Sequence, residues 1–182
     1  MKKITVIFLL LFLIVTAKTF SDDIPPTFAL INFSVNSMSP QGYWKDIFTP
    51  APTFSLSIQY PAKVLQLYIG GRIDFSMLNG KEFNDVYMQI FSLNVIASYN
   101  VLEFGNGILY VGAGLGVNFE ELQFGDGEED AILGGVKLDC GLRRQISETL
   151  LITINLGYTY IPDTPFITFG VGLSYSFSKF SK

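Results

Sequence analysis

The chain has 182 residues, of which 49% are hydrophobic and only 15% are charged, and its formal net charge is −4. This length suits one domain, and charged residues are scarcer than the roughly one quarter that is usual in soluble domains. An acidic chain without a lysine- or arginine-rich stretch after its first residues is expected to bind polyanions poorly, which argues against nucleic-acid binding. Histidine is absent and Cys140 is the single cysteine, so no internal disulfide is expected.

The amino terminus has the pattern of an export signal. Lys2 and Lys3 precede an apolar run over residues 6–15, and small and polar residues follow. The run is shorter than the roughly 20 residues that a membrane helix needs. The sequence therefore predicts a signal peptide over residues 1–21, with cleavage after Ser21 or Ala17, and a barrel domain over residues 22–182.

Apolar and polar residues alternate through most of the remaining chain, a period of two that indicates strands rather than helices. In residues 150–160 and 166–177 the pattern is nearly unbroken. It also predicts strands at 28–38, 53–60, 64–77, 87–99, 108–119 and 131–143. Leu30, Met88 and Ile90 depart from it, because they fall on the otherwise polar face. Eight strands of about 9–11 residues each match the bilayer-crossing strands of a closed antiparallel barrel.

The segment "YVGAGLGVNF" contains Gly112, Gly114 and Gly116. A dinucleotide-binding loop would open a helix at this point, but an acidic, turn-like segment without helical periodicity follows. The glycines instead make one face of a strand small, as the interior of a narrow barrel requires.

The composition of the polar face indicates whether the apolar face of the strands contacts lipid or a protein core. It carries glycine, serine, threonine, asparagine and glutamine rather than the lysine and glutamate of a water-exposed sheet. Five charged residues lie within the predicted strands, all on this face: Arg72, Asp74, Lys137, Asp139 and Arg143. We therefore expect the apolar face to contact lipid, where one arginine or lysine at mid-bilayer would cost about 2–4 kcal/mol.

These features resemble the small eight-stranded bacterial outer-membrane barrels, the group that contains OmpX, OmpW and the membrane domain of OmpA. The most specific likeness is the carboxyl-terminal "FGVGLSYSF", in which Phe169, Val171, Leu173, Tyr175 and Phe177 match the family's assembly signal. The chain departs from the family by continuing through "SKFSK", so Phe180 is an alternative to Phe177 as the recognised aromatic residue. The resemblance implies insertion by the barrel-assembly machinery and a location in the outer membrane, with lipid as the surroundings.

The charged residues of the predicted interior form two short motifs. Arg72 and Asp74, like Lys137 and Asp139, are two residues apart and therefore share a face. In a narrow lumen they should pair with each other or across the barrel. A salt-bridged plug is the favoured interpretation, and a gate whose pairs exchange partners is the alternative.

Two predicted surface loops contain candidate contact residues. Residues 39–52 carry Tyr43, Trp44 and Phe48, which would form a patch for an extracellular partner or rest at the membrane interface. Residues 120–130 carry the acidic run from Asp126 to Asp130. A solvated loop is favoured there over a calcium site, because the spacing differs from that of an EF-hand.

The sequence thus predicts a monomeric outer-membrane barrel with a structural or surface-interaction role and a narrow, charge-plugged lumen. An OmpW-like conduit for small apolar molecules is the first alternative, and a soluble periplasmic β-sandwich that binds a ligand is the second. No cofactor, metal or catalytic residue is predicted. Without histidine, neither a Ser-His arrangement nor a common zinc site is available.

Overall fold

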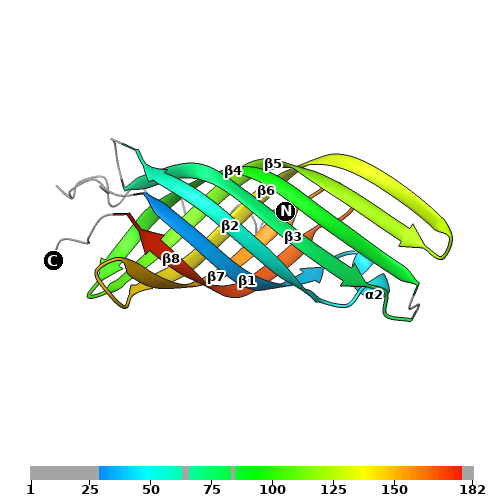
Figure 1. The fold of residues 1–182 in the computed structure, drawn as a ribbon, viewed down its shortest axis with the longest axis horizontal. Helices are drawn as coiled ribbons and strands as arrows, with labels where there is room; N and C mark the ends of the chain where they lie inside the picture. The colour runs from blue at the N-terminus through cyan, green and yellow to red at the C-terminus, as the bar shows by residue number, and fades with distance from the viewer. Residues whose placement is uncertain (1–28, 63–65, 83–84, 178–182) are drawn as a thin grey trace, which may run out of the picture.

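The protein is a closed barrel of eight antiparallel strands, each paired with its neighbours in chain order (Figure 1). The computed structural model describes residues 29–62, 66–82 and 85–177. The elements are β1 (Leu30–Pro40), α2 (Trp44–Ile47), β2 (Ala51–Pro61), β3 (Leu67–Asn79), β4 (Val86–Phe104), β5 (Gly107–Phe124), β6 (Gly127–Gln145), β7 (Leu150–Tyr160) and β8 (Phe166–Ser176). The predicted signal peptide lies outside the described residues. In the described part of the chain, no helix is long and apolar enough to cross a bilayer.

The barrel closes where β1 meets β8, with partners running from Leu30↔Ser176 to Pro40↔Phe166. Ala29 and Phe177 lie at the same end, where the Phe177 amide donates to the Ala29 carbonyl at 3.2 Å. We call this the terminal end, and the opposite end, which carries α2, the α2 end (Figure 1). Closure leaves no unpaired edge through the middle of the barrel, the condition that a sheet must meet to lie in hydrocarbon.

The two faces of the strands are sorted as the alternation predicts. Serine, threonine, asparagine and glutamine side chains are buried inside, among them Ser34, Asn36, Ser57 and Asn155. The outer wall consists of half-exposed apolar side chains, and we call this surface the outward belt. It includes Phe33, Phe54, Leu56, Ile73, Leu93, Leu109, Val117, Ile154, Phe169 and Leu173. A water-soluble sandwich would bury these residues, so the β-sandwich alternative is wrong for this fold.

Inward-facing glycines let the barrel remain narrow. A Cβ at Gly70 would lie 1.8 Å from the carbonyl oxygen of Ile58, and one at Gly112 would lie 2.6 Å from Asp139 Oδ1. Neither added Cβ atom can be accommodated unless the backbone or the Asp139 carboxylate moves. The glycines of "YVGAGLGVNF" therefore keep room for interior side chains within a continuous strand, β5.

Four strands are longer than predicted, and β4, β5 and β6 extend furthest beyond the expected bounds. The prediction of a loop at 120–130 is wrong, since β5 and β6 stay paired up to Phe124↔Gly127 around a turn at Gly125. Likewise β4 and β5 pair up to Phe104↔Gly107 around Gly105. Gly105 and Gly125 have φ of +55° and +53°, which glycine adopts without steric cost. Tight turns allow the ladders to continue where composition alone indicates loops.

Candidate functional site

The middle of the barrel interior contains an ion network centred on Asp74. Arg72 Nε donates to Asp74 Oδ1 at 2.6 Å, and Lys137 Nζ donates to Asp74 Oδ2 at 3.0 Å. Ser55 Oγ donates to Oδ1 at 2.5 Å, and Asn94 Nδ2 donates to Oδ2 at 3.2 Å. Arg72, Asp74 and Lys137, which we call the charge network, are all buried. One carboxylate thus pairs with two cations and accepts hydrogen bonds at both of its oxygens, which offsets part of the cost of burying these charges.

Arg143 lies nearer the terminal end and forms no ion pair with an acidic side chain of the described ranges. Its guanidinium lies 4.0 Å from the ring centroid of Tyr110 and 5.7 Å from that of Tyr68. Its Nη atoms also donate to Asn100, Gln59 and Ser98, each at 3.4 Å. Aromatic faces and amide oxygens therefore stabilise this buried cation.

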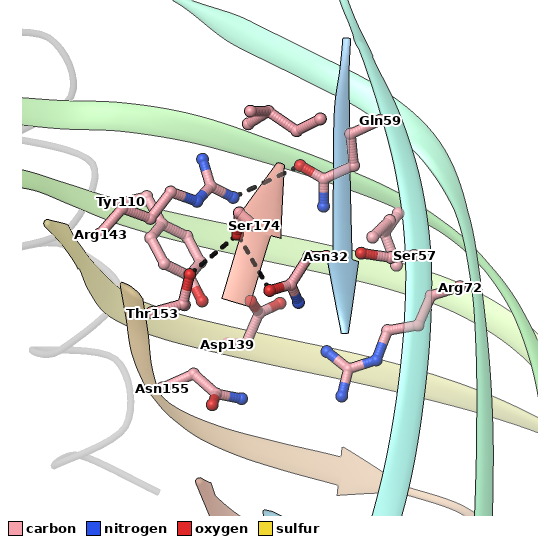
Figure 2. Close-up of a pocket in the computed structure, with 12 residues that line it drawn as sticks. Asn32, Ser57, Gln59, Arg72, Tyr110, Asp139, Arg143, Thr153, Asn155 and Ser174 are labelled. Carbon is pink, nitrogen blue, oxygen red and sulfur yellow. Dashed lines mark hydrogen bonds between the residues drawn. The ribbon is translucent and has the colours of Figure 1, made fainter. Parts of the chain in front are cut away.

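A cavity of about 20 Å³ separates Arg143 from the charge network (Figure 2). It has room for about one water molecule. The Asp139 side chain points into it between Arg143 and Arg72, and Asn155 lies beside them (Figure 2). Asp139 is half-buried and forms no ion pair with any described residue. Of the two predicted arrangements, pairing within a motif is found for Arg72 and Asp74, whereas Lys137 pairs across the barrel with Asp74 rather than with Asp139.

The α2 end of the lumen is filled by apolar side chains. We call this cluster the apolar cap; its buried members are Met38, Phe48, Ala51, Leu78, Val86, Met88, Ile90, Ile161 and Phe166. Trp44 and Ile47 of α2, with Leu122 and Leu133, pack against it. At the terminal end a smaller cluster joins Leu30, Tyr68 and Leu151. The interior is therefore layered, with apolar clusters at both ends and a polar, charged middle.

The apolar cap and the small cluster explain the residues that broke the alternation. Leu30, Met88 and Ile90 face inward as their positions require, but they lie at the ends of the lumen rather than in its polar middle. Sequence reasoning noted these departures without assigning them to a cap. The available signal was that apolar residues on the polar face occur near the ends of the predicted strands.

The three aromatic residues predicted as a surface patch are divided by the structure. Tyr43 is 74% exposed, whereas Phe48 is 1% exposed and belongs to the apolar cap. Trp44 is half-buried, with its ring stacked on that of Phe48 at a centroid distance of 5.6 Å. The prediction for Phe48 is wrong because α2 directs the chain back over the lumen, where the Thr49 amide bonds to the Asn79 carbonyl at 3.0 Å.

The acidic run lies on the hairpin of β5 and β6 rather than on a loop. Asp126, Glu128, Glu129 and Asp130 are exposed beyond the apolar cap. Within the described ranges, no group of three histidine, cysteine, aspartate or glutamate side chains is arranged to hold a metal ion.

The predicted assembly signal lies along β8 and its end. Phe169, Val171, Leu173, Tyr175 and Phe177 all point outward and are 48–59% exposed. They share one face of the strand that closes the barrel against β1. Phe180, the alternative terminal aromatic residue, lies outside the described residues.

Comparison with known proteins supports the fold. No family model matches the chain, and no curated protein matches it by sequence. Among solved structures, Neisserial surface protein A (NspA) aligns with a TM-score of 0.67 and 12% identity, over 85% of this chain and 100% of that one. The amino-terminal barrel domain of Pseudomonas aeruginosa OprF aligns with a TM-score of 0.59 and 16% identity, over 85% and 100%.

Ail, the attachment invasion locus protein of Yersinia pestis, aligns with a TM-score of 0.55 and 17% identity, covering 82% of this chain and 97% of that one. At such identities the likeness concerns the fold. It agrees with the outward belt and the polar lumen, which are derived from this chain's own residues. The chain has the fold of the small eight-stranded barrels of the bacterial outer membrane, and its outward belt is the surface that such barrels turn toward hydrocarbon.

Proposed function

We propose that this protein resides in the outer membrane as a barrel with a closed lumen and that its role is structural or lies in contacts at the cell surface. The observation that carries the proposal is the layering of the lumen. The apolar cap fills the α2 end, the charge network spans the middle and the Leu30 cluster occupies the terminal end. An eight-stranded barrel has space for little more than its interior side chains.

Planar-bilayer recording tests closure. We expect the wild-type protein to show no sustained channel, because the cavity in its middle is only about 20 Å³. A steady ion current from folded wild-type protein would contradict the proposal. The variants Asp74→Ala and Asp139→Ala test gating by exchange of ion partners: unchanged currents in both would argue against a gate, whereas new channel openings would favour one.

A conduit for small apolar molecules is the second candidate, and the apolar cap favours it as an apolar entrance. The polar middle layer interrupts such a path, since Arg72, Asp74 and Lys137 lie buried below the cap. Uptake of an apolar fluorescent compound by cells with and without the protein separates the two functions. Equal uptake supports the closed barrel, and faster uptake with the protein supports the conduit.

The exposed α2 end indicates the chemistry of a surface partner. With both termini in the periplasm, as in bacterial barrels, the α2 end faces outward from the cell. Among the described residues, its exposed basic side chains are Lys45 and Lys81, and its exposed acidic side chains are more numerous: Asp46, Glu82, Asp85, Asp126, Glu128, Glu129, Asp130 and Asp163. Such a surface favours a cationic polypeptide, whereas Ail has been solved with the polyanionic heparin analogue sucrose octasulfate.

We expect polylysine to bind the reconstituted protein and sucrose octasulfate not to bind it. Replacing Glu128, Glu129 and Asp130 together by their amides should weaken polylysine binding, and more so at low salt, because exposed charges are screened above about 0.1 M salt. Titration calorimetry at two salt concentrations measures both effects. Binding of sucrose octasulfate, or polylysine binding that the triple variant leaves unchanged, would refute this assignment.

The remaining partner and activity assignments belong to the same proposal. Insertion by the barrel-assembly machinery is supported by the outward aromatic and aliphatic face of β8, which ends at Phe177. We also expect a monomer without an enzymatic role, since the chain contains no histidine to act as a catalytic base. Heat-dependent migration on a gel, with sedimentation of the detergent-solubilised protein, checks the barrel and its oligomeric state.

A further inference from the structure

The hairpin of β5 and β6 leaves one strand edge without a neighbour at the α2 end. On one side, β6 pairs with β5 up to Phe124↔Gly127. On the other side, its pairing with β7 begins only at Val136↔Tyr160, because β7 ends at Tyr160 and a short connection leads into β8. The hairpin therefore projects beyond the ends of β7 and β8 (Figure 1). We call residues 127–135 of β6 the open edge, since no described strand pairs with them on the β7 side.

The register shows which backbone groups of the open edge are not used by β5. Gly125 and Asp126 form a two-residue turn, so the residues that flank it, Phe124 and Gly127, form a hydrogen-bonded pair. Hydrogen-bonded and non-hydrogen-bonded pairs alternate along an antiparallel ladder. Every second residue after Gly127 therefore bonds to β5, and the residues between them direct their N–H and C=O groups away from it. These intervening residues are Glu128, Asp130, Ile132 and Gly134.

The open edge is exposed and has few of the features that prevent strand pairing. Ile132 is 71% exposed, and a Cβ added at Gly134 would meet no atom within 4 Å. The edge contains no proline, and its register with β5 shows no bulge. Natural sheet edges are usually protected by such features or by charged side chains, lysine above all. Here the charged side chains are Glu128, Glu129 and Asp130, which repel acidic strands and attract basic ones.

We propose that the open edge binds an extended basic segment of a partner protein as an added antiparallel strand. This inference rests on the proposed surface role and specifies how a cationic partner is held. Backbone hydrogen bonds along the edge supply affinity, and contacts with alternate side chains supply selectivity.

The register also predicts the sequence pattern of the partner segment. The residues with unused backbone groups place their side chains on the outer face of β6, where Ile132 is exposed. In an antiparallel partner strand, the side chains opposite Ile132, Asp130 and Glu128 occur in that order at every second position. The matching segment has an apolar residue and then two basic residues, with one residue between each.

A synthetic peptide in which threonine alternates with one valine and then two lysines tests the mode of binding. The matched control is the same peptide methylated on the backbone nitrogens of the valine and both lysines. Methylation keeps the charges and side chains but removes the donors that would bond to the open edge. We expect the reconstituted wild-type protein to bind the methylated peptide at least roughly tenfold more weakly, because several backbone hydrogen bonds are lost. Titration calorimetry measures both affinities.

Two substitutions test the same edge from the side of the protein. Ile132→Pro removes an N–H that the open edge offers, and proline is tolerated where the N–H of an edge strand faces solvent. Ile132→Thr is the matched control, because it removes the apolar side chain but keeps the N–H and a β-branched shape. We expect Ile132→Pro to weaken binding of the unmethylated peptide clearly more than Ile132→Thr does. Polylysine binding should be the same in both variants, since Glu128, Glu129 and Asp130 are retained.

Equal binding of the two peptides by the wild-type protein would overturn strand addition, and so would equal effects of the two substitutions in folded protein. Heat-dependent migration establishes folding, and if Ile132→Pro does not fold, the comparison of peptides on the wild-type protein decides alone. A wild-type dimer that Ile132→Pro converts to monomer would assign the open edge to a second copy of the chain.

Polylysine separates this inference from the proposed function. Binding of polylysine together with equal binding of the two peptides refutes strand addition alone. Failure of both polylysine and the unmethylated peptide to bind refutes the cationic partner as well.

Discussion

Replacing Asp74 by alanine should lower the free energy of unfolding by about 3–5 kcal/mol, the range measured when one partner of a buried ion pair is removed. The carboxylate is the acceptor for Arg72 and Lys137 at 2.6 and 3.0 Å, so its loss leaves two buried cations without an ion partner. Urea-induced unfolding of the protein in lipid vesicles, followed by the heat-modifiability gel, measures the change.

Asp139→Ala is the matched control for this prediction. Asp139 faces the same lumen but borders a cavity and forms no ion pair with the described residues. Removing the Asp139 side chain should therefore lower the free energy of unfolding clearly less than removing that of Asp74. Equal losses from the two variants would mean that the charge network does not depend on Asp74 in the way that the contacts indicate.

Replacing Phe48 by alanine should also destabilise the barrel, by about 3 kcal/mol, as truncation of a buried phenylalanine does. Phe48 is 1% exposed within the apolar cap, and its ring stacks on that of Trp44. Truncation would leave a void at the α2 end and release α2 from the lumen. Unfolding in urea reports the stability, and fluorescence of Trp44, the single tryptophan, reports the release as a shift to longer wavelength.

Tyr43→Ala provides the comparison, because Tyr43 comes from the same connection and is 74% exposed. A surface substitution of this kind is expected to change stability by no more than about 0.5 kcal/mol. If Phe48→Ala and Tyr43→Ala behaved alike, the apolar cap would contribute nothing to the stability of the barrel, and closure of the α2 end would need another explanation.

The charge network also limits what the lumen can do. Asp74 accepts hydrogen bonds from side chains on four strands: Ser55 on β2, Arg72 on β3, Asn94 on β4 and Lys137 on β6. Admitting a solute would require several of these bonds to break together, with the two cations left in a medium of low dielectric constant. This is the physical reason for preferring a structural or surface role to transport.

The alternation of the sequence determined the strands, their number and the face that each residue takes. Period two is a local property, since successive side chains point to opposite sides of any strand. Glycine, serine and asparagine opposite leucine, valine and phenylalanine therefore identified the lumen and the outward belt. Arg72, Asp74, Lys137 and Arg143 were placed correctly inside on this basis.

Only the tertiary structure decided which of these residues meet. Lys137 and Asp74 are 63 residues apart and lie on β6 and β3, which are not neighbours, so their contact depends on how the closed barrel brings opposite walls together. Lys137 thereby pairs with Asp74 although Asp139 is closer along the chain. Phe48 turns inward because α2 folds over the mouth, and the acidic segment is strand because its partner continues beside it. These outcomes depend on register, closure and loop direction, which composition and local periodicity do not encode.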